Sequence, residues 1–273
     1  MRSQESALFE TLGVEIRGAI GELRLDRPEK LNPLSIRMLE EIAAAARHFD
    51  EQSGVKVVIV SGVGRAFSAG ADLASFSSAQ DRTAHEIAEI GRRMADSLEA
   101  MRALSIARIQ GWCIGGGFVL ASACDLRVAA EDARFSIPEV DLGIPLTWGG
   151  IPRMVREIGP ARTKELVLTC RPFDAMEARS IGFLNRVVPA EALKAEVDEL
   201  ATSLSKKAAH ALFSTKRHVN AIMDQMVGTT RSWADADGMV TAFQDEECQQ
   251  IRRDYLGTHS GKGARARSST KRG

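Results

Sequence analysis

The N-terminal part of the chain changes its hydrophobic pattern twice. Residues 12–25 alternate apolar and polar positions on either side of Gly18, which predicts a β-hairpin. Ser35 then precedes a run with apolar residues at helical spacing, so we expect Ser35 to cap a helix. Residues 55–62 are almost continuously apolar, which is typical of a strand that is covered on both faces.

Strands and helices continue to alternate in the middle of the chain. Apolar runs at 105–111 and 125–130 predict two core strands, and a shorter strand is expected at 134–137. A long helix is expected at about 83–103 and a short one at 118–124. This alternation predicts a layered α/β core with at least some parallel strand pairing.

The last third of the chain is predicted to be nearly all helical. Asp174 and Glu177 form a capping signature for a short helix, and one more short strand is expected before Pro189. Three helices are then expected, at 191–206, 208–224 and 230–255. The chain is thereby divided into an α/β core that carries the site (1–190), a helical C-terminal region (191–256) and a basic, disordered tail (257–273).

Composition and charge change this picture little. Hydrophobic residues make up 44% of the 273, no apolar run approaches the roughly 20 residues of a membrane span, and the N-terminus lacks the apolar stretch of a signal peptide. We therefore expect a cytoplasmic protein with no membrane partner. The formal net charge is zero, although the tail carries five basic residues and no acid. A solvated tail is favoured over one that binds nucleic acid or acidic lipid.

The cysteines and histidines do not suggest a redox or metal site. Four cysteines show no paired spacing, which predicts reduced, mostly buried thiols. The histidines lack the spacing of metal ligands, so no metal is expected. Ser68 and Cys113 have no base beside them in the sequence, and we interpret Cys113 as a packing residue.

Two glycine-containing segments that follow core strands are candidates for binding. In Gly64–Leu73, Gly70 would let the backbone approach a ligand and the amide of Ala71 is a candidate donor, although an ordinary surface loop has the same composition. In Gly111–Phe118, three consecutive glycines open a helix, whose free N–H groups suit an anion or a developing oxyanion. Close packing of helix on strand is the alternative reading of that segment.

A third segment, Phe135–Pro145, holds a candidate acid/base group. Glu139 lies among apolar residues, and such surroundings would raise the pKa of its carboxyl group, as general acid/base catalysis requires. A glutamate that faces solvent is equally consistent with the local sequence.

Taken in order, these segments resemble the enoyl-CoA hydratase/isomerase (crotonase) family. The resemblance rests on Ala66–Leu73, Ile109–Ala130 and Ala133–Pro145, and it extends from about Leu12 to Tyr255. Weaker matches support it at 25–35, where Pro33 departs from the usual small residue, and at 147–155, 182–189 and 211–220.

The resemblance implies a fold, an assembly and a ligand. The fold would be a crotonase-like (ClpP/crotonase) α/β spiral of ββα repeats with a helical C-terminal region that forms trimers. The partners would be an acyl-CoA thioester substrate and further copies of the chain, in a homotrimer or a dimer of trimers. Coenzyme A would enter as part of the substrate, so no separate cofactor is expected.

The resemblance also assigns roles to individual residues. The two backbone amides of the family's oxyanion hole map onto Ala71 and Gly116. Contacts with the substrate and its coenzyme A portion are implied for Gly70, Asp72, Leu73 and Gly115. The family's hydratases hold a water molecule between two glutamates, of which the second maps onto Glu139 and the first onto Val119.

Valine at position 119 changes the expected chemistry. A general acid/base group contributes about 10²–10⁴-fold in rate, so hydration by two glutamates should be badly impaired. One carboxylate suffices for double-bond isomerisation, which makes Glu139 the expected catalytic residue of an isomerase. Alternatives are a hydratase in which another carboxylate, such as Asp141, replaces the missing one, other thioester chemistry of the family, and an acyl-CoA binder without turnover. Trp148 is expected to line the pocket, although a core position suits it as well.

Overall fold

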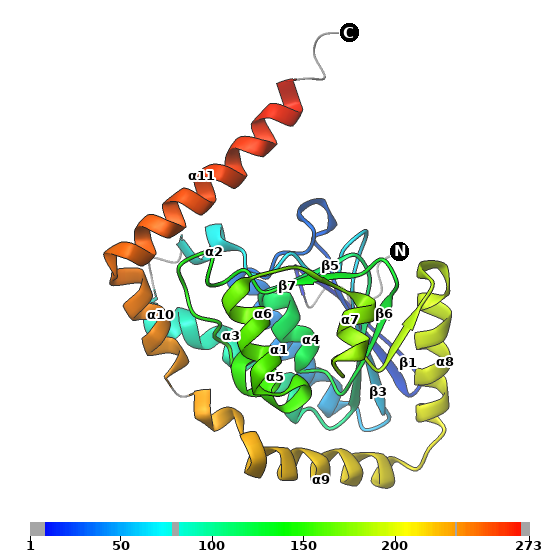
Figure 1. Ribbon diagram of the computed structural model, residues 1–273. Coiled ribbons are helices and arrows are strands. Elements are labelled where there is room, and N and C mark those ends of the chain that lie inside the picture. Colours follow the sequence, from blue (N-terminus) through cyan, green and yellow to red (C-terminus); the bar gives the residue numbers. More distant parts are fainter. Residues whose placement is uncertain (1–8, 78–81, 233, 269–273) are drawn as a thin grey trace.

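Two β-sheets carry the core of the molecule. The computed structural model describes residues 9–77, 82–232 and 234–268, and Figure 1 shows helices packed around the central sheet. Within these residues the larger sheet has six strands in the order β1-β2-β3-β4-β6-β9, and a smaller sheet has the order β5-β7-β8. The strands are β1 (Leu12–Arg17), β2 (Ile20–Leu25), β3 (Val57–Gly62), β4 (Leu104–Ile109), β5 (Trp112–Ile114), β6 (Leu126–Ala130), β7 (Arg134–Ser136), β8 (Phe173–Asp174) and β9 (Arg186–Val188).

The helices begin where the capping residues of the sequence predict. Ser35 Oγ accepts a hydrogen bond from Met38 N at 3.2 Å, and Asp174 accepts one from Glu177 N at 2.8 Å. The α-helices are α1 (Ile36–Glu51), α2 (Leu73–Ser77), α3 (Ala84–Ala100), α4 (Gly116–Ser122), α5 (Gly150–Ile158), α6 (Pro160–Thr169), α7 (Ala175–Ser180), α8 (Leu193–Ser205), α9 (Ala209–Val227), α10 (Asp235–Gln244) and α11 (Glu246–Ser268). None of the helices in the described ranges is long and apolar enough to cross a membrane.

The large sheet combines the predicted hairpin with the predicted parallel core. β1 and β2 pair antiparallel around Gly18, whose φ of +62° suits glycine in the tight turn. From β2 onward each strand pairs in parallel with its neighbour, through β3, β4, β6 and β9. Parallel strands end at the same edge of a sheet, so the loops that follow β3 and β4 emerge together.

β3 is buried on both faces, as its continuous apolar run predicts. Val57 and Ile59 pack in a small core with Leu193 and Val197 of α8, on one face of the sheet. Val58 and Val60 belong to the main core, which the sheet shares with α1, α3 and α4 on the other face. Figure 1 shows α8 (yellow-green) on the opposite side of the sheet from these helices. The two-residue period of a strand explains why both faces require apolar side chains.

The C-terminal helices differ from the prediction in two respects. The expected helix at 230–255 is broken, because Asp245 has extended backbone and caps a new helix, accepting from Cys248 N at 2.9 Å. The expected disordered tail also differs, because α11 continues through Ser268; residues 269–273 lie outside the described residues. Extending a helix that has already formed costs less than nucleating one, and composition alone does not register that continuity. α10 packs against α3, and α11 projects away from the body in Figure 1.

Candidate active site

The two glycine-containing segments run side by side beyond the ends of β3 and β4. Ser68 and Cys113 form a parallel bridge, in which Ser68 N donates to Trp112 O and Ile114 N donates to Ser68 O, both at 3.0 Å. A β-carbon on Gly117 would lie 2.7 Å from the Ser68 β-carbon, so glycine is required for this close approach. The packing alternative for the glycines is therefore correct in part, and it brings both candidate amides to one place.

The amide of Ala71 is left unused by the bridge that holds its segment. Leu34 and Ala71 form a parallel bridge, in which Leu34 N donates to Gly70 O at 2.7 Å and Asp72 N donates to Leu34 O at 3.0 Å. These bonds use the groups on either side of Ala71, so its own N–H points to the opposite side. Gly70 has a φ of +88°, and a β-carbon there would lie 2.9 Å from Ile114 O.

The amide of Gly116 lies at the start of a helix. Gly116 is the first residue of α4, and Gly115 before it is the N-cap, with a φ of +48°. The first N–H groups of a helix have no partner within the helix, and they form the positive end of its dipole. The β-carbon position of Gly70 lies 3.7 Å from Gly116 N, so the Ala71 segment and this helix start adjoin.

Ala71 and Gly116 both line an apolar pocket whose one ionisable side chain, among the described residues, is Glu139. Figure 1 shows the surrounding elements, with α2, α3 and α10 grouped on one side of the molecule. The apolar part of the lining comes from Leu73, Phe76, Ile87, Val119, Ile144, Leu146, Met239 and Phe243. The pocket thus presents two backbone donors and one carboxylate in otherwise apolar surroundings.

The Glu139 carboxylate is poorly solvated. Its Oε2 atom is buried and has no hydrogen-bond partner among the described residues. Burial raises the pKa of Glu139 from its usual value near 4.5 to about 7. A β-carbon on Gly115 would lie 2.5 Å from Glu139 Oε1, so the absent side chain leaves room for the carboxylate next to the start of α4. Glu139 is therefore set up to exchange a proton near neutral pH.

Val119 lines the pocket, whereas the alternative carboxylate, Asp141, does not. Val119 is buried, lines the pocket and lies close to Gly150, whose β-carbon position is 2.9 Å from Val119 Cγ2. Asp141 is exposed and does not line the pocket, so it is not brought to Glu139's side of the cavity. No other carboxylate among the described lining residues takes the place of the missing glutamate.

Trp148 forms one wall of the pocket and is also largely buried. A β-carbon on Gly116 would lie 2.2 Å from its Cζ3 atom, and one on Gly91 of α3 would lie 2.1 Å from Cδ2 and Cε2. The indole is therefore packed between two glycine backbones. It also stacks on Phe76, with ring centroids 6.1 Å apart. Both expectations for Trp148 hold, since only 6% of it is exposed and the remaining surface lines the pocket.

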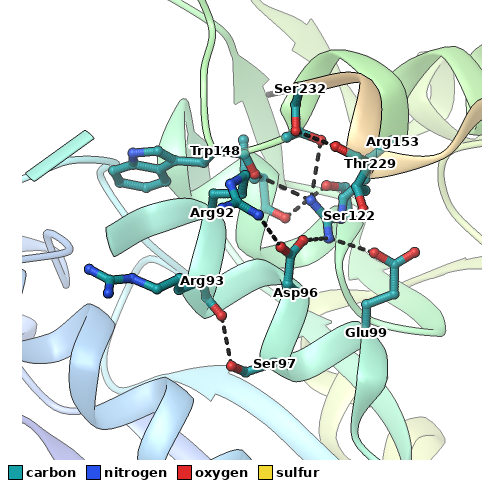
Figure 2. Close-up of polar contacts among 12 residues, drawn as sticks. Arg92, Arg93, Asp96, Ser97, Glu99, Ser122, Trp148, Arg153, Thr229 and Ser232 are labelled. Carbon is teal, nitrogen blue, oxygen red and sulfur yellow. Dashed lines mark hydrogen bonds and ion pairs between the residues drawn. The ribbon is translucent and has the colours of Figure 1, made fainter. Parts of the chain in front are cut away.

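Arg153 holds the backbone that carries Trp148. Trp148 has a φ of +62°, which is uncommon for a bulky residue and needs support from its surroundings. Arg153 is fully buried, and its Nη1 donates to the carbonyls of Trp148 and Gly149, each at 3.2 Å. Its Nη2 donates to Asp96 at 2.9 Å and to Glu99 at 2.5 Å. Figure 2 shows this network, with the indole directed away from the guanidinium.

α10 is tied to the same segment. Gly149 N donates to Asp235 Oδ2 at 2.8 Å, and burial raises the pKa of the Asp235 carboxyl. Asp235 is the first residue of α10, which supplies Met239 and Phe243 to the pocket. The helix that closes the pocket and the loop that carries Trp148 are thereby held together.

The remaining predicted binding residues lie at the edge of the pocket. Leu73 lines it and is 37% exposed. Asp72 does not line it; its carboxylate forms an ion pair with Arg27 at 2.7 Å and accepts from Ser75 N. The side chain of Asp72 thus stabilises the loop and the start of α2.

Two nucleophilic side chains near the site have structural roles. Ser68 Oγ donates to Asn32 O at 2.8 Å and accepts from Gly70 N at 3.2 Å, which fixes the loop before Ala71. Cys113 is buried, and burial raises the pKa of its thiol well above the usual value. The prediction that Cys113 is a packing residue is confirmed.

Sequence reasoning missed several residues of the site. Phe76 comes from a segment for which the sequence predicted no helix or strand. Ile87 lies in the predicted helix at 83–103, but its place in the pocket was not foreseen, and Met239 and Phe243 come from a helix far away in the chain. Gly91 was overlooked, although a glycine inside a predicted helix is a signal of close packing. For Met239 and Phe243 the sequence held no local signal, because their place depends on how α10 packs against α3.

Comparison with known proteins identifies the family. Residues 15–261 match the family Enoyl-CoA hydratase/isomerase. A probable enoyl-CoA hydratase of Mycobacterium bovis is 38% identical over 215 residues, covering 78% of this chain and 82% of that protein. The crotonyl-CoA hydratase of Syntrophomonas wolfei is 34% identical, covering 88% and 93%.

Solved structures agree with the sequence relatives. The crystal structure of an enoyl-CoA hydratase/isomerase from Xanthobacter autotrophicus superposes with a TM-score of 0.82 at 28% identity, covering 94% of this chain and 96% of that one. An enoyl-CoA hydratase subunit from Geobacillus kaustophilus gives 0.75 at 34% identity, with 92% and 96% covered. The predicted crotonase-like fold is confirmed, and the chain belongs to the enoyl-CoA hydratase/isomerase family.

Proposed function

We propose that this protein isomerises the double bond of an enoyl-CoA thioester, with Glu139 as the only proton carrier. The observation that carries the proposal is the make-up of the pocket: Glu139 is the one carboxylate among its described lining residues, and Val119, onto which the resemblance maps the hydratases' other glutamate, also lines it. Isomerisation needs one group that takes a proton and returns it, whereas hydration by the family's scheme needs two.

The amides of Ala71 and Gly116 are proposed to hold the thioester oxygen. Both residues line the pocket, and the local bonding of each leaves its N–H free for a ligand. Negative charge develops on the thioester oxygen when a neighbouring C–H bond is broken, and preorganised donors stabilise that charge. A single donor of this kind contributes about 10²–10³-fold in rate.

The reaction is then a proton shuttle across one face of the substrate. The Glu139 carboxylate removes a proton from C2 of a 3-enoyl-CoA, and the electrons of the broken C–H bond pass into an enolate whose oxygen lies between the two amides. The neutral Glu139 then returns the proton to C4. As the C4–H bond forms, the double bond moves to C2–C3 and the thioester carbonyl is restored.

The surroundings of Glu139 suit both halves of this cycle. A pKa of about 7 makes the carboxylate a stronger base than an ordinary glutamate and keeps its acid form accessible near neutral pH. The apolar walls formed by Val119, Leu146 and Trp148 exclude water from the enolate. Val119 in particular offers no group to orient a water molecule for attack at C3.

Hydration is the second candidate, and the names of the relatives favour it. The Mycobacterium bovis relative is called a probable enoyl-CoA hydratase, and that of Syntrophomonas wolfei a crotonyl-CoA hydratase. A hydratase with Val119 would have to add water using Glu139 alone. The two candidates predict different products from the same substrates, so they are separable in one assay.

The test is a parallel assay of 3-enoyl-CoA and 2-enoyl-CoA substrates of several chain lengths, with double-bond position and water addition followed by mass spectrometry. We expect isomerised product without a hydroxyl group, and a loss of about 10²–10⁴-fold in Glu139→Gln. Asp141→Asn is the matched control, because it neutralises an exposed carboxylate two residues away that does not line the pocket. Hydroxyacyl-CoA as the main product would establish hydration instead. Binding without turnover on every substrate would overturn both candidates.

The proposal includes self-association, as the resemblance implies. Val219, Ile222 and Met226 of α9 are 50%, 48% and 70% exposed, and these positions lie close to one face of the helix. Such a group of large apolar side chains is expected to be covered in an assembly. Light scattering on the purified protein should give three or six times the mass of one chain, and the mass of a single chain would contradict this.

A further inference from the structure

The apolar pocket continues beyond the active site towards α11. A second cavity shares Leu73, Phe76, Ile87, Ile144 and Phe243 with the pocket of Glu139. Its further lining residues are Leu142, Arg252 and Leu256, of which the last two belong to α11. Apart from Arg252, the residues that line this extension are apolar.

Arg252 has an unusual environment for an arginine. Among the described residues, its Nη2 donates to two backbone carbonyls and to no side chain, with Gly143 O at 3.3 Å and Ala242 O at 3.2 Å. Its Nε is buried without a hydrogen-bond partner, and its Cζ lies 4.5 Å from the centre of the Phe243 ring. Within the described ranges no carboxylate lies within 4.0 Å of the guanidinium.

Other enclosed arginines of this chain are neutralised. Arg27, Arg127 and Arg153 each form an ion pair with a carboxylate, at 2.7, 2.6 and 2.5 Å respectively. Taking a charge out of water is costly unless an opposite charge compensates for it. Desolvation accordingly lowers the pKa of Arg252. A guanidinium left without a counter-charge in the wall of an apolar cavity is a ready site for an anion.

α11 is held firmly against the pocket at this point. A β-carbon on Gly143 would lie 2.5 Å from Cys248 O, so the first turn of α11 packs directly on the loop that supplies Leu142 and Ile144. Gly143 needs its φ of +64° for the same turn. Arg252 is one helical turn further along α11, so its position relative to the cavity is fixed by backbone contacts.

We propose that the substrate's acyl chain ends in a carboxylate and that Arg252 binds this carboxylate at the far end of the pocket. The proposal rests on acyl-CoA binding at the Glu139 pocket, but it does not depend on isomerisation rather than hydration. The apolar walls of Phe76, Ile87, Ile144 and Phe243, between Glu139 and Arg252, suit a hydrocarbon chain. The same apolar walls are a poor environment for the phosphates of coenzyme A, the other available anions, because phosphates remain hydrated.

The test compares binding of paired saturated ligands, which needs no turnover. Dissociation constants are measured by calorimetry for adipoyl-, suberoyl- and sebacoyl-CoA against hexanoyl-, octanoyl- and decanoyl-CoA. For wild type we expect the carboxylate-terminated ligand of at least one length to bind about 10–100-fold more tightly than its methyl-terminated partner, the value of one charge-assisted hydrogen bond or ion pair. The ratio should fall towards one in Arg252→Met and recover in part in Arg252→Lys.

Arg253→Gln is the matched control, because Arg253 is the next residue of α11, is exposed and, within the described part of the chain, hydrogen-bonds to Gln250 alone. A ratio near one at every length in wild type would overturn the proposal. The proposal would also be overturned if Arg252→Met weakened the binding of both ligands of each pair equally and weakened the binding of coenzyme A more than that of dephospho-coenzyme A. The anion bound by Arg252 would then be a coenzyme A phosphate. If the isomerase assay fails but the binding ratios are as expected, Arg252 keeps its proposed role and only the proposed reaction is contradicted.

Discussion

The indole of Trp148 occupies the space that a side chain on Gly116 would need, since a β-carbon on Gly116 would lie 2.2 Å from Trp148 Cζ3. The same glycine supplies one of the two amides proposed to hold the thioester oxygen. The aromatic wall of the pocket and the proposed oxyanion hole therefore depend on each other's geometry. Any change that moves the indole is therefore expected to alter the position of the Gly116 amide relative to the reacting end of the substrate.

Removing the indole should alter substrate preference and stability together. Trp148→Ala opens the wall between Gly91 and Gly116, so kcat/KM should shift towards acyl groups that are bulkier near C2 to C4. The lost packing should cost about 3–5 kcal/mol of unfolding free energy. Denaturant unfolding and a series of branched substrates measure the two effects. Trp112→Ala is the control, because Trp112 is 40% exposed and does not line the pocket, and an equal effect there would contradict this account.

The interactions of Arg153 should contribute far more to the free energy of unfolding than the more exposed ion pair between Arg92 and Asp96. Arg153→Met removes a fully buried partner from Asp96 and from Glu99, which keep only Arg92 and Arg156, and it frees the Trp148 carbonyl, so we expect a loss of about 3–5 kcal/mol. Arg92→Met also removes an ion pair to Asp96, but Arg92 is 32% exposed, so its loss should cost less than about 1 kcal/mol. Chemical denaturation of both variants checks the contrast, and similar losses would show that burial of Arg153 is not what matters.

Much of the fold follows from local pattern, and much of the pocket does not. The continuous apolar run of β3 and the cap at Ser35 act within a few residues, so the strand and the helix were both predictable. The apolar surroundings expected for Glu139 were predictable in part, because Ile144, close to it in sequence, lines the same pocket. Phe243 and Arg252 reach the pocket only through the packing of α10 on α3 and of α11 on Gly143, and no local pattern encodes those contacts.

The pH dependence of turnover should report Glu139 directly. The carboxylate must be ionised to remove a proton, and its pKa is raised to about 7, so kcat/KM should rise with pH through that value. An ordinary glutamate would already be fully ionised at pH 6. A stopped assay across pH 5–9 measures the profile, and a plateau that extends below pH 6 would contradict a desolvated Glu139.

The same pKa shift predicts how stability changes with pH. Between about 4.5 and 7 the folded protein retains a proton on Glu139 that the unfolded chain releases, so unfolding becomes easier as the pH rises through this window. Glu139→Gln cannot ionise and should be more stable than wild type above pH 7, by on the order of 1–3 kcal/mol. The two proteins should differ much less at pH 4.5, and a constant difference across the range would exclude this cause.

Restoring a carboxylate at position 119 should move the chemistry towards hydration. Val119→Glu supplies the second group, and water addition to 2-enoyl-CoA should rise by up to about 10²-fold. The tight contact with Gly150 and the burial of a charge should lower the melting temperature. Val119→Gln is the matched control, because it has nearly the same size but cannot exchange a proton. Equal hydration rates in the two variants would show that the valine does not limit the reaction.

The most direct test of a single proton carrier is the fate of the C2 proton itself. A 3-enoyl-CoA labelled with deuterium at both C2 positions is converted in ordinary water that contains oxygen-18, and the product is analysed by mass spectrometry. The account predicts a 2-enoyl-CoA that retains part of the deuterium at C4 and contains no oxygen-18, because Glu139 Oε2 is buried and exchanges slowly with solvent. A product with oxygen-18 at C3, or with C4 hydrogen derived entirely from solvent, would contradict it.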